Sequence, residues 1–211
     1  MGKTVVREDP YREKIGYFDA HVAAPWSAQE YGPAEWKKLE RLFRYTGSIE
    51  GLKVLEPGCG TGRLTEILSQ RLGPSGRVVA LDISPKMIEA ARTRLAGRGN
   101  VELHLGAVED FPLGKGAFDL ILCHQVFPHF HDKKKVLKHL ASALRSRGKL
   151  IVFHFIPGVR INDRHRKAGT AVEGDLMPPF KVMKQMFQEA GFRVDLFLDD
   201  EEGYFLAACK G

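Results

Sequence analysis

Short apolar segments alternate along most of the chain with longer segments of helical periodicity, and this alternation restricts the possible folds more than any other feature. The apolar segments are residues 53–56, 77–82, 101–105, 118–123 and 150–155. Most of them are continuously apolar, as strands buried on both faces are. The segments of helical periodicity between them are residues 63–72, 84–96 and 132–144. Strands that alternate with helices in this way predict an α/β domain with a mostly parallel sheet and helices on both faces.

The pattern changes near the C-terminus. Residues 180–190 are predicted to form a helix that ends at Gly191, and two strands follow at 192–197 and 204–209. The link between these strands is short, acidic and contains Gly203. Because a link of this length cannot support a parallel crossover, we expect an antiparallel pair.

Composition is that of one ordinary globular domain. The chain has 211 residues, of which 44% are hydrophobic and 27% charged, which argues against disordered and fibrous classes. The cysteines Cys59, Cys123 and Cys209 form no CxxC pair, which favours a reducing compartment over a disulfide framework or a zinc ribbon. No apolar run approaches the ~20 residues that cross a bilayer, and Arg7 and Glu8 lie where a signal peptide would be apolar. We therefore expect a cytoplasmic protein without a membrane partner.

A glycine-rich turn follows the first predicted strand. That strand ends at Glu56, and Gly58, Gly60 and Gly62 lead into the next helix. Glycine tolerates positive φ and has no Cβ, so a ligand can lie against such a backbone. The next strand ends at Asp82, twenty positions after Gly62, where a carboxylate can accept hydrogen bonds from ribose hydroxyls. The alternative is a simple tight turn followed by a helix-capping acid.

The spacing Gly-x-Gly-x-Gly differs from the GxGxxG pattern of nicotinamide-binding proteins. The sequence instead resembles the class I S-adenosylmethionine-dependent methyltransferases, in particular the small-molecule branch similar to the ubiquinone/menaquinone C-methyltransferases. The resemblance spans residues 15–210 and rests on YFDAH at 17–21, LEPGCGTG at 55–62, ALDISPKM at 80–87, GAVEDFP at 106–112, residues 118–132 and LRSRGKLIV at 144–152. It implies a Rossmann-like seven-stranded sheet with a C-terminal antiparallel hairpin, S-adenosylmethionine as cofactor and a small-molecule acceptor.

The resemblance also implies which residues contact the cofactor. The methionine end would lie against Glu56 and the turn residues Gly58, Cys59 and Gly60, and Asp82 would bind the ribose. The adenine would lie among Ile83, Met87, Val108 and Glu109, and Cys123 would border the site from the fourth strand. Ile83 and Met87 are equally consistent with an ordinary helix core.

One position departs from the family pattern. Relatives commonly have an acid directly after the glycine of the third motif, whereas this chain has Ala107 there. Either Glu109 supplies the missing acceptor for the adenine amino group, or the backbone does.

Histidines near the end of the fourth strand are the candidate catalytic residues. In this fold that strand end faces the transferable methyl group, so His124 is the first candidate for a base or substrate orienter and His129 the second. The alternative is that backbone groups satisfy both rings at a loop edge. With His131, His154 and His165 they raise the question of a metal site, but the spacing fixes no ligand geometry, and we predict no metal.

The regions around the sheet suggest how the chain is organised. The helical, aromatic-rich residues 1–50 are predicted to form a lid over the S-adenosylmethionine-binding domain of residues 51–211. Residues 157–179 are polar and without clear periodicity, which predicts a substrate-shaping insertion. Their basic part, 160–167, is either a contact for an acidic substrate group or a solvated loop.

Other functions remain as alternatives to small-molecule methylation. The net charge of +6 permits RNA as a substrate, and a protein methyltransferase or a non-catalytic S-adenosylmethionine-binding module would need the same glycine turn. The chain has no RNP or KH pattern, which argues against nucleic acid. The oligomeric state is left open.

Overall fold

The computed structural model describes residues 9–211. Arg7, Glu8 and the rest of the first eight residues of the expected lid lie outside the described residues. Three helices precede the sheet: α1 (Arg12–Ala20), α2 (Pro25–Ala28) and α3 (Pro33–Thr46). None of the helices in the described part has the length and apolar character to cross a bilayer.

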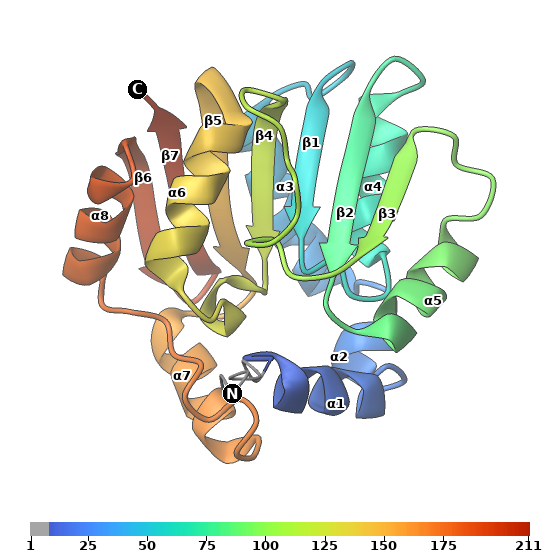
Figure 1. The fold of residues 1–211 in the computed structure, drawn as a ribbon, viewed down its shortest axis with the longest axis vertical. Coiled ribbons are helices and arrows are strands. Elements are labelled where there is room, and N and C mark those ends of the chain that lie inside the picture. Colours follow the sequence, from blue (N-terminus) through green and yellow to red (C-terminus); the bar gives the residue numbers. More distant parts are fainter. Residues whose placement is uncertain (1–8) are drawn as a thin grey trace, which may run out of the picture.

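A single mixed sheet of seven strands forms the centre of the molecule, in the order β3-β2-β1-β4-β5-β7-β6 (Figure 1). The strands are β1 (Lys53–Pro57), β2 (Arg77–Asp82), β3 (Val101–Leu105), β4 (Phe118–His124), β5 (Leu144–His154), β6 (Phe192–Asp200) and β7 (Gly203–Lys210). Strands β1 to β5 run parallel, and β7 is antiparallel to both of its neighbours. The predicted α/β fold with a C-terminal antiparallel hairpin is confirmed.

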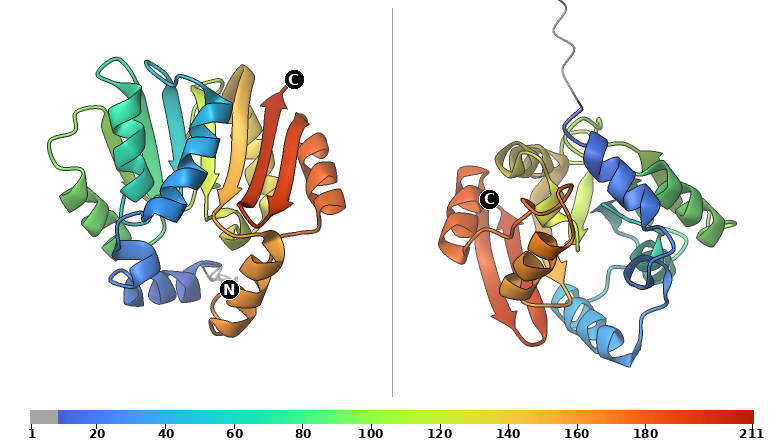
Figure 2. Two further views of the ribbon diagram at one scale, coloured as in Figure 1. Left: turned by 180° about the vertical axis from the view of Figure 1, so that it is seen from behind. Right: turned by 90° about the horizontal axis from the view of Figure 1, so that it is seen from below.

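Helices cover both faces of the sheet. The remaining helices are α4 (Arg63–Leu72), α5 (Pro85–Arg94), the 3-10 turn η1 (Phe127–His129), α6 (Lys133–Ala143), α7 (Gly158–Lys167) and α8 (Phe180–Glu189). One apolar cluster joins α3, α4 and α5 to the sheet, and a second joins α6 and α8 to its other face. Figure 1 shows α6 and α8 in front, and Figure 2 (left) shows α3 and α4 from behind.

Two elements differ from the sequence-based expectation. Residues 158–167, which show no clear periodicity in the sequence, form the regular helix α7, of which only Gly158 and Ile161 are buried. An amphipathic pattern is hard to detect when so little of a helix is buried. Strand β5 begins at Leu144 rather than at residue 150, because Leu144 pairs with Phe118 before an irregularity in the register.

The carboxyl edge of the parallel strands is covered. Helices α1, α2 and α7 lie across this edge, below the sheet in Figure 1 and facing the viewer in Figure 2 (right). Ligands of open parallel sheets bind at this edge, because the strand-to-helix turns meet there. Helices α1 and α2 and the segment that contains α7 therefore lie where a ligand would be enclosed.

Candidate active site

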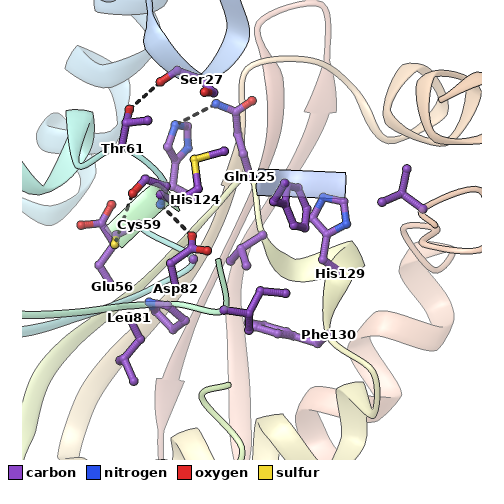
Figure 3. A pocket seen from close by; sticks show the side chains of 18 of the residues that line it. Ser27, Glu56, Cys59, Thr61, Leu81, Asp82, His124, Gln125, His129 and Phe130 are labelled. Carbon is purple, nitrogen blue, oxygen red and sulfur yellow. Dashed lines mark hydrogen bonds between the residues drawn. The ribbon is translucent and has the colours of Figure 1, made fainter. Parts of the chain in front are cut away.

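A cavity of about 390 Å³ lies between the carboxyl edge of the sheet and the helices α1, α2 and α7. The residues that line it include, of those singled out in the sequence, Glu56, Gly58, Cys59, Gly60, Asp82, Ile83, Met87, Val108, Glu109, His124 and His129. In Figure 3, Glu56 and Asp82 lie on one side of this cavity and His129 on the other. The structure thus brings together residues from four strand ends.

Cys123 is the one predicted site residue that does not line the cavity. It is fully buried in the apolar cluster under α6 and α8. Side chains of successive strand residues point to opposite faces, and here only the neighbouring His124 reaches the cavity. Its placement gives Cys123 a packing role.

The turn after β1 has the geometry that its glycines predict. Gly58 and Gly60 have φ values of 69° and 55°. A Cβ on Gly58 would lie 2.6 Å from the Cβ of Val126, whereas a Cβ on Gly60 would meet no atom within 4 Å. Gly58 therefore allows close packing inside the protein, and Gly60 leaves space on the cavity side for a ligand.

Asp82 at the end of β2 is an acceptor that organises this turn. Its two carboxylate oxygens accept hydrogen bonds from the backbone N–H groups of Gly60 and Ser84, both at 2.9 Å. Figure 3 shows Asp82 beside the glycine turn. Burial raises the pKa of Asp82 to about 6, against the lowering effect of these hydrogen bonds. A carboxylate has further lone pairs, so Asp82 can also accept from a ligand.

Glu56 at the end of β1 is a buried acid. Its carboxylate accepts a hydrogen bond from the Thr65 hydroxyl at 2.7 Å. Burial, with a smaller contribution from Asp82, raises the pKa of Glu56 to about 8. Within residues 9–211 no lysine or arginine forms an ion pair with Glu56, so a cationic group on a ligand would stabilise its ionised form.

Glu109, which follows β3, has one oxygen without a partner. Its Oε1 accepts a hydrogen bond from the Tyr11 hydroxyl of the N-terminal segment, and its Oε2 is buried with no hydrogen-bond partner in the described part of the chain. A buried acceptor of this kind is costly unless a ligand donates to it. Met87 and Val108, which are 2% and 4% exposed, provide apolar wall beside it.

The chain is similar in sequence to known methyltransferases. A family model described as "Methyltransferase domain" matches residues 49–191, which is most of the chain. A demethylmenaquinone methyltransferase of Lactococcus lactis is 35% identical over 113 residues, covering 53% of this chain and 45% of the relative. A ubiquinone/menaquinone biosynthesis C-methyltransferase of Idiomarina loihiensis is 34% identical over 125 residues, covering 56% and 50%.

The chain belongs to the class I S-adenosylmethionine-dependent methyltransferases.

Solved structures agree on the fold. The magnesium protoporphyrin IX methyltransferase of Synechocystis PCC 6803, solved with bound SAH, has a TM-score of 0.71 at 21% identity and covers 96% of this chain and 100% of its own. A SAM-dependent methyltransferase of Aquifex aeolicus has a TM-score of 0.69 at 22% identity, covering 96% and 99%. This methyltransferase chain spans about half the length of the curated relatives named above.

The cavity of this methyltransferase fits the cofactor of its family. Among the described residues, Glu56 has no counter-ion and Glu109 has one oxygen without a partner, while Gly60 leaves open space. S-adenosylmethionine carries an ammonium group, a ribose diol and an adenine amino group, all of which donate hydrogen bonds. The donor groups of the cofactor and the acceptor groups of this end of the cavity are therefore complementary.

His124 at the end of β4 is held in a neutral state. Its Nδ1 lies 3.1 Å from the carbonyl oxygen of Phe153, so Nδ1 carries the proton and donates. The side-chain amide of Gln125 then donates to Nε2, also at 3.1 Å (Figure 3). Burial lowers the pKa of His124 to about 3. Both ring nitrogens are already used, which favours a positioning role over proton transfer.

A second group of histidines lies at the far end of the cavity. His129 in η1, His154 at the end of β5 and His165 in α7 all line it. The rings of His129 and His165 are 4.7 Å apart, and Nε2 of His154 is buried without a hydrogen-bond partner among the described residues. Among residues 9–211 no group of three or more histidine, cysteine or carboxylate side chains is placed to hold a metal ion.

Three residues at or beside the cavity were not predicted from the sequence. Gln125 has an unusual φ of 55°, which no sequence signal marks. Lys14 and Asp175 are isolated charges in segments without a motif, and they form a buried ion pair with 2.7 Å between Nζ and Oδ1. Only the three-dimensional arrangement shows that they lie beside His129.

Proposed function

We propose that this chain transfers the methyl group of S-adenosylmethionine to a small-molecule acceptor. The observation that carries the proposal is one continuous cavity with two chemically different ends. Carboxylates and bare glycine backbone line one end, and imidazoles with apolar side chains such as Phe130, Ile161 and Val172 line the other. A cavity of about 390 Å³ is within the size range of small-molecule sites.

The cover over the cavity supports a small acceptor. Arg63 of α4 donates to the backbone carbonyls of Trp26 and of Gln29, the latter at 2.7 Å, which holds the N-terminal segment over the site. On the other side, the Lys14–Asp175 ion pair joins α1 to the segment after α7. We propose that residues 1–50 act as the lid and residues 157–179 shape the acceptor end, so that a polymer would need both to open.

The names of two relatives support methylation of a small-molecule group. The Lactococcus protein is named as a demethylmenaquinone methyltransferase, and a Paenibacillus relative, 32% identical over 161 residues, as a malonyl-[acyl-carrier protein] O-methyltransferase. Their acceptors differ from each other, so they support methylation of a metabolite-like group without naming this chain's acceptor. Three free cysteines among the described residues support a cytoplasmic location.

Bound S-adenosylmethionine would supply an electrophilic methyl group. We propose that Glu56 binds the ammonium of its methionine part and Asp82 its ribose hydroxyls, while Glu109 accepts from the adenine amino group. Ile83, Met87 and Val108 enclose the adenine. These contacts fix the direction of the methyl group toward the imidazole end, and orientation of this kind lowers the barrier to an in-line displacement.

The test is a transfer assay with S-adenosylmethionine labelled in its methyl group. The purified chain is offered a small-molecule extract, total RNA and a protein pool, with reactions from which the protein is omitted as the negative control. We expect label in the small-molecule fraction. Label in RNA or protein alone would contradict the proposal, and tight cofactor binding without transfer to any pool would favour a non-catalytic module.

A further inference from the structure

A buried set of charged side chains lies directly behind His129. Nδ1 of His129 is 2.7 Å from Oδ2 of Asp175, and Oδ1 of Asp175 is 2.7 Å from Nζ of Lys14. Lys14 also donates to the backbone carbonyl of His129 at 2.9 Å. The side chains of His129, Asp175 and Lys14 are only 13%, 10% and 11% exposed. Three separate segments, α1, η1 and the residues after α7, therefore meet at one ion-pair network.

This network determines the protonation of the His129 ring. Burial by itself would raise the pKa of Asp175, but the hydrogen bonds from His129 and Lys14 outweigh it and hold the pKa below its ordinary value. An ionised carboxylate only accepts hydrogen bonds, so the proton of neutral His129 is on Nδ1. Nε2 is then unprotonated and carries a lone pair, and no group in residues 9–211 forms a hydrogen bond with it.

His129 and His124 therefore differ in what they can do. Nε2 of His124 already accepts from Gln125, and no carboxylate lies against its Nδ1, which faces the carbonyl of Phe153. His129 has a free Nε2 and a carboxylate behind the opposite nitrogen, which would stabilise the imidazolium form. The His129 ring lies beside the ring of His165 and edge-on to the ring of Phe18, with centroid separations of 4.7 Å and 5.1 Å.

We propose, resting on the methyl-transfer function above, that His129 is the general base for the acceptor and that Asp175 and Lys14 are its positioning residues. The acceptor is then a largely apolar molecule whose methylated atom bears a dissociable proton, on oxygen, on sulfur or on an enolisable carbon. As the bond from that atom to the methyl carbon forms, the carbon–sulfur bond breaks and its electron pair stays on sulfur. The acceptor's proton passes to Nε2 of His129.

The charge that develops in this step explains why the Asp175 carboxylate lies against His129. One positive charge leaves the sulfur and one appears on the His129 imidazolium, next to Asp175. Lys14 holds Asp175 in place through its other oxygen, so the base is complete only when α1 and the segment after α7 are both closed over the cavity. Proton transfer is thereby confined to the closed, water-poor state.

The Asp175→Asn variant tests this arrangement. Lys14 will attract the amide oxygen, which turns the amide NH₂ group toward Nδ1 of His129. The ring proton must then move to Nε2, and the base loses its lone pair. Nitrogen NMR of histidine-labelled protein saturated with S-adenosylhomocysteine reports this tautomer directly, with the His129 signals assigned by their loss in His129→Gln. The matched control is Asp163→Asn, the same change at an exposed acid of α7 that pairs with Arg166.

We expect His129 protonated on Nδ1 in the wild type and in Asp163→Asn, and on Nε2 in Asp175→Asn. With the acceptor found in the labelling assay, kcat should fall roughly 10²–10⁴-fold in His129→Gln and in Asp175→Asn while KM for S-adenosylmethionine stays unchanged. A wild-type ring protonated on Nε2, or an unchanged tautomer in Asp175→Asn, would overturn the proposal. Failure of S-adenosylhomocysteine to bind would instead contradict the proposed function.

Discussion

At the scale of single residues, two acidic side chains of the site are buried, which disfavours their ionised forms in the protein without a ligand. Glu56 is 2% exposed and Asp82 is 9% exposed, and burial raises the pKa of both. Functional sites commonly keep such groups at a cost in stability. Each acid therefore gives a prediction, one for stability and one for binding.

For stability, Glu56→Gln should make the empty protein more stable at alkaline pH. The folded-state pKa of Glu56, about 8, lies above its ordinary value of 4.5. The stabilising contribution of the protonated side chain to the free energy of unfolding is therefore fully present below pH 4.5 and is lost as the pH rises through 8. Glutamine stays neutral throughout. The variant should gain about 4 kcal/mol at pH 8 and less than about 1 kcal/mol at pH 5.

Urea unfolding of both proteins at the two pH values measures this difference. The exposed acid Glu50 provides the control variant Glu50→Gln, which should match the wild type at both. A gain in Glu56→Gln that is equal at pH 5 and pH 8 would show that Glu56 is not the buried acid described above.

For binding, Asp82→Asn should weaken the affinity for S-adenosylhomocysteine by roughly 1–3 kcal/mol, about 5- to 150-fold, because a ligand hydroxyl loses a charged acceptor. Titration calorimetry on the folded variant measures the change. Asp110→Asn is the matched control, since Asp110 is 76% exposed and does not line the cavity. Equal affinity in Asp82→Asn and wild type would exclude Asp82 from the cofactor site.

At the scale of elements, the turn between β1 and α4 depends on close packing as well as on backbone freedom. Gly58→Ala should be destabilising for two reasons, the positive φ and the collision of the new Cβ with Val126. Gly97→Ala shares the first reason alone, since Gly97 has a φ of 81° with nothing within 4 Å of a Cβ.

Comparison of the two alanine variants by thermal unfolding separates these costs. Gly97→Ala should lose about 1 kcal/mol and Gly58→Ala at least about 1 kcal/mol more. Equal losses would mean that Val126 moves away freely, and the close approach of the turn would then have no structural importance.

Elements with strong periodicity were predictable from the sequence, and those that interact through few residues were not. The strand ends at Glu56 and Asp82 and the glycine turn predicted the acid-lined end of the cavity, because continuous apolar strands fix where polar residues emerge. Helix α7 escaped because its only buried residues are Gly158 and Ile161. Asp175 escaped because its role arises from contacts with Lys14 and His129, which are distant in sequence.

At the scale of the whole molecule, the N-terminal helices, the sheet edge and α7 act together as one enclosure. The contacts that close it are mostly polar, and they include Tyr11 to Glu109, Lys14 to Asp175 and Arg63 to the carbonyls of Trp26 and Gln29. These contacts lie outside the hydrogen-bonded strand pairs, so the enclosure can open without breaking the sheet.

Hydrogen–deuterium exchange with and without S-adenosylhomocysteine tests this enclosure. Ligand binding should slow exchange in residues 58–62, because the ligand contacts this turn. It should also slow exchange in α1, because the bound ligand makes opening of the lid less frequent. The β6–β7 hairpin lies outside the cavity and should be unchanged, which makes it the internal control. Protection of residues 58–62 without protection of α1 would contradict the lid.

We propose that one cavity holds the cofactor at its acid-lined end and presents the methyl position to His129. A crystal structure with bound S-adenosylhomocysteine would show this arrangement. We expect the ammonium at Glu56, the ribose on Asp82, the adenine at Glu109 and the sulfur turned toward Nε2 of His129. A nucleoside bound elsewhere, or a sulfur that faces away from His129, would contradict it.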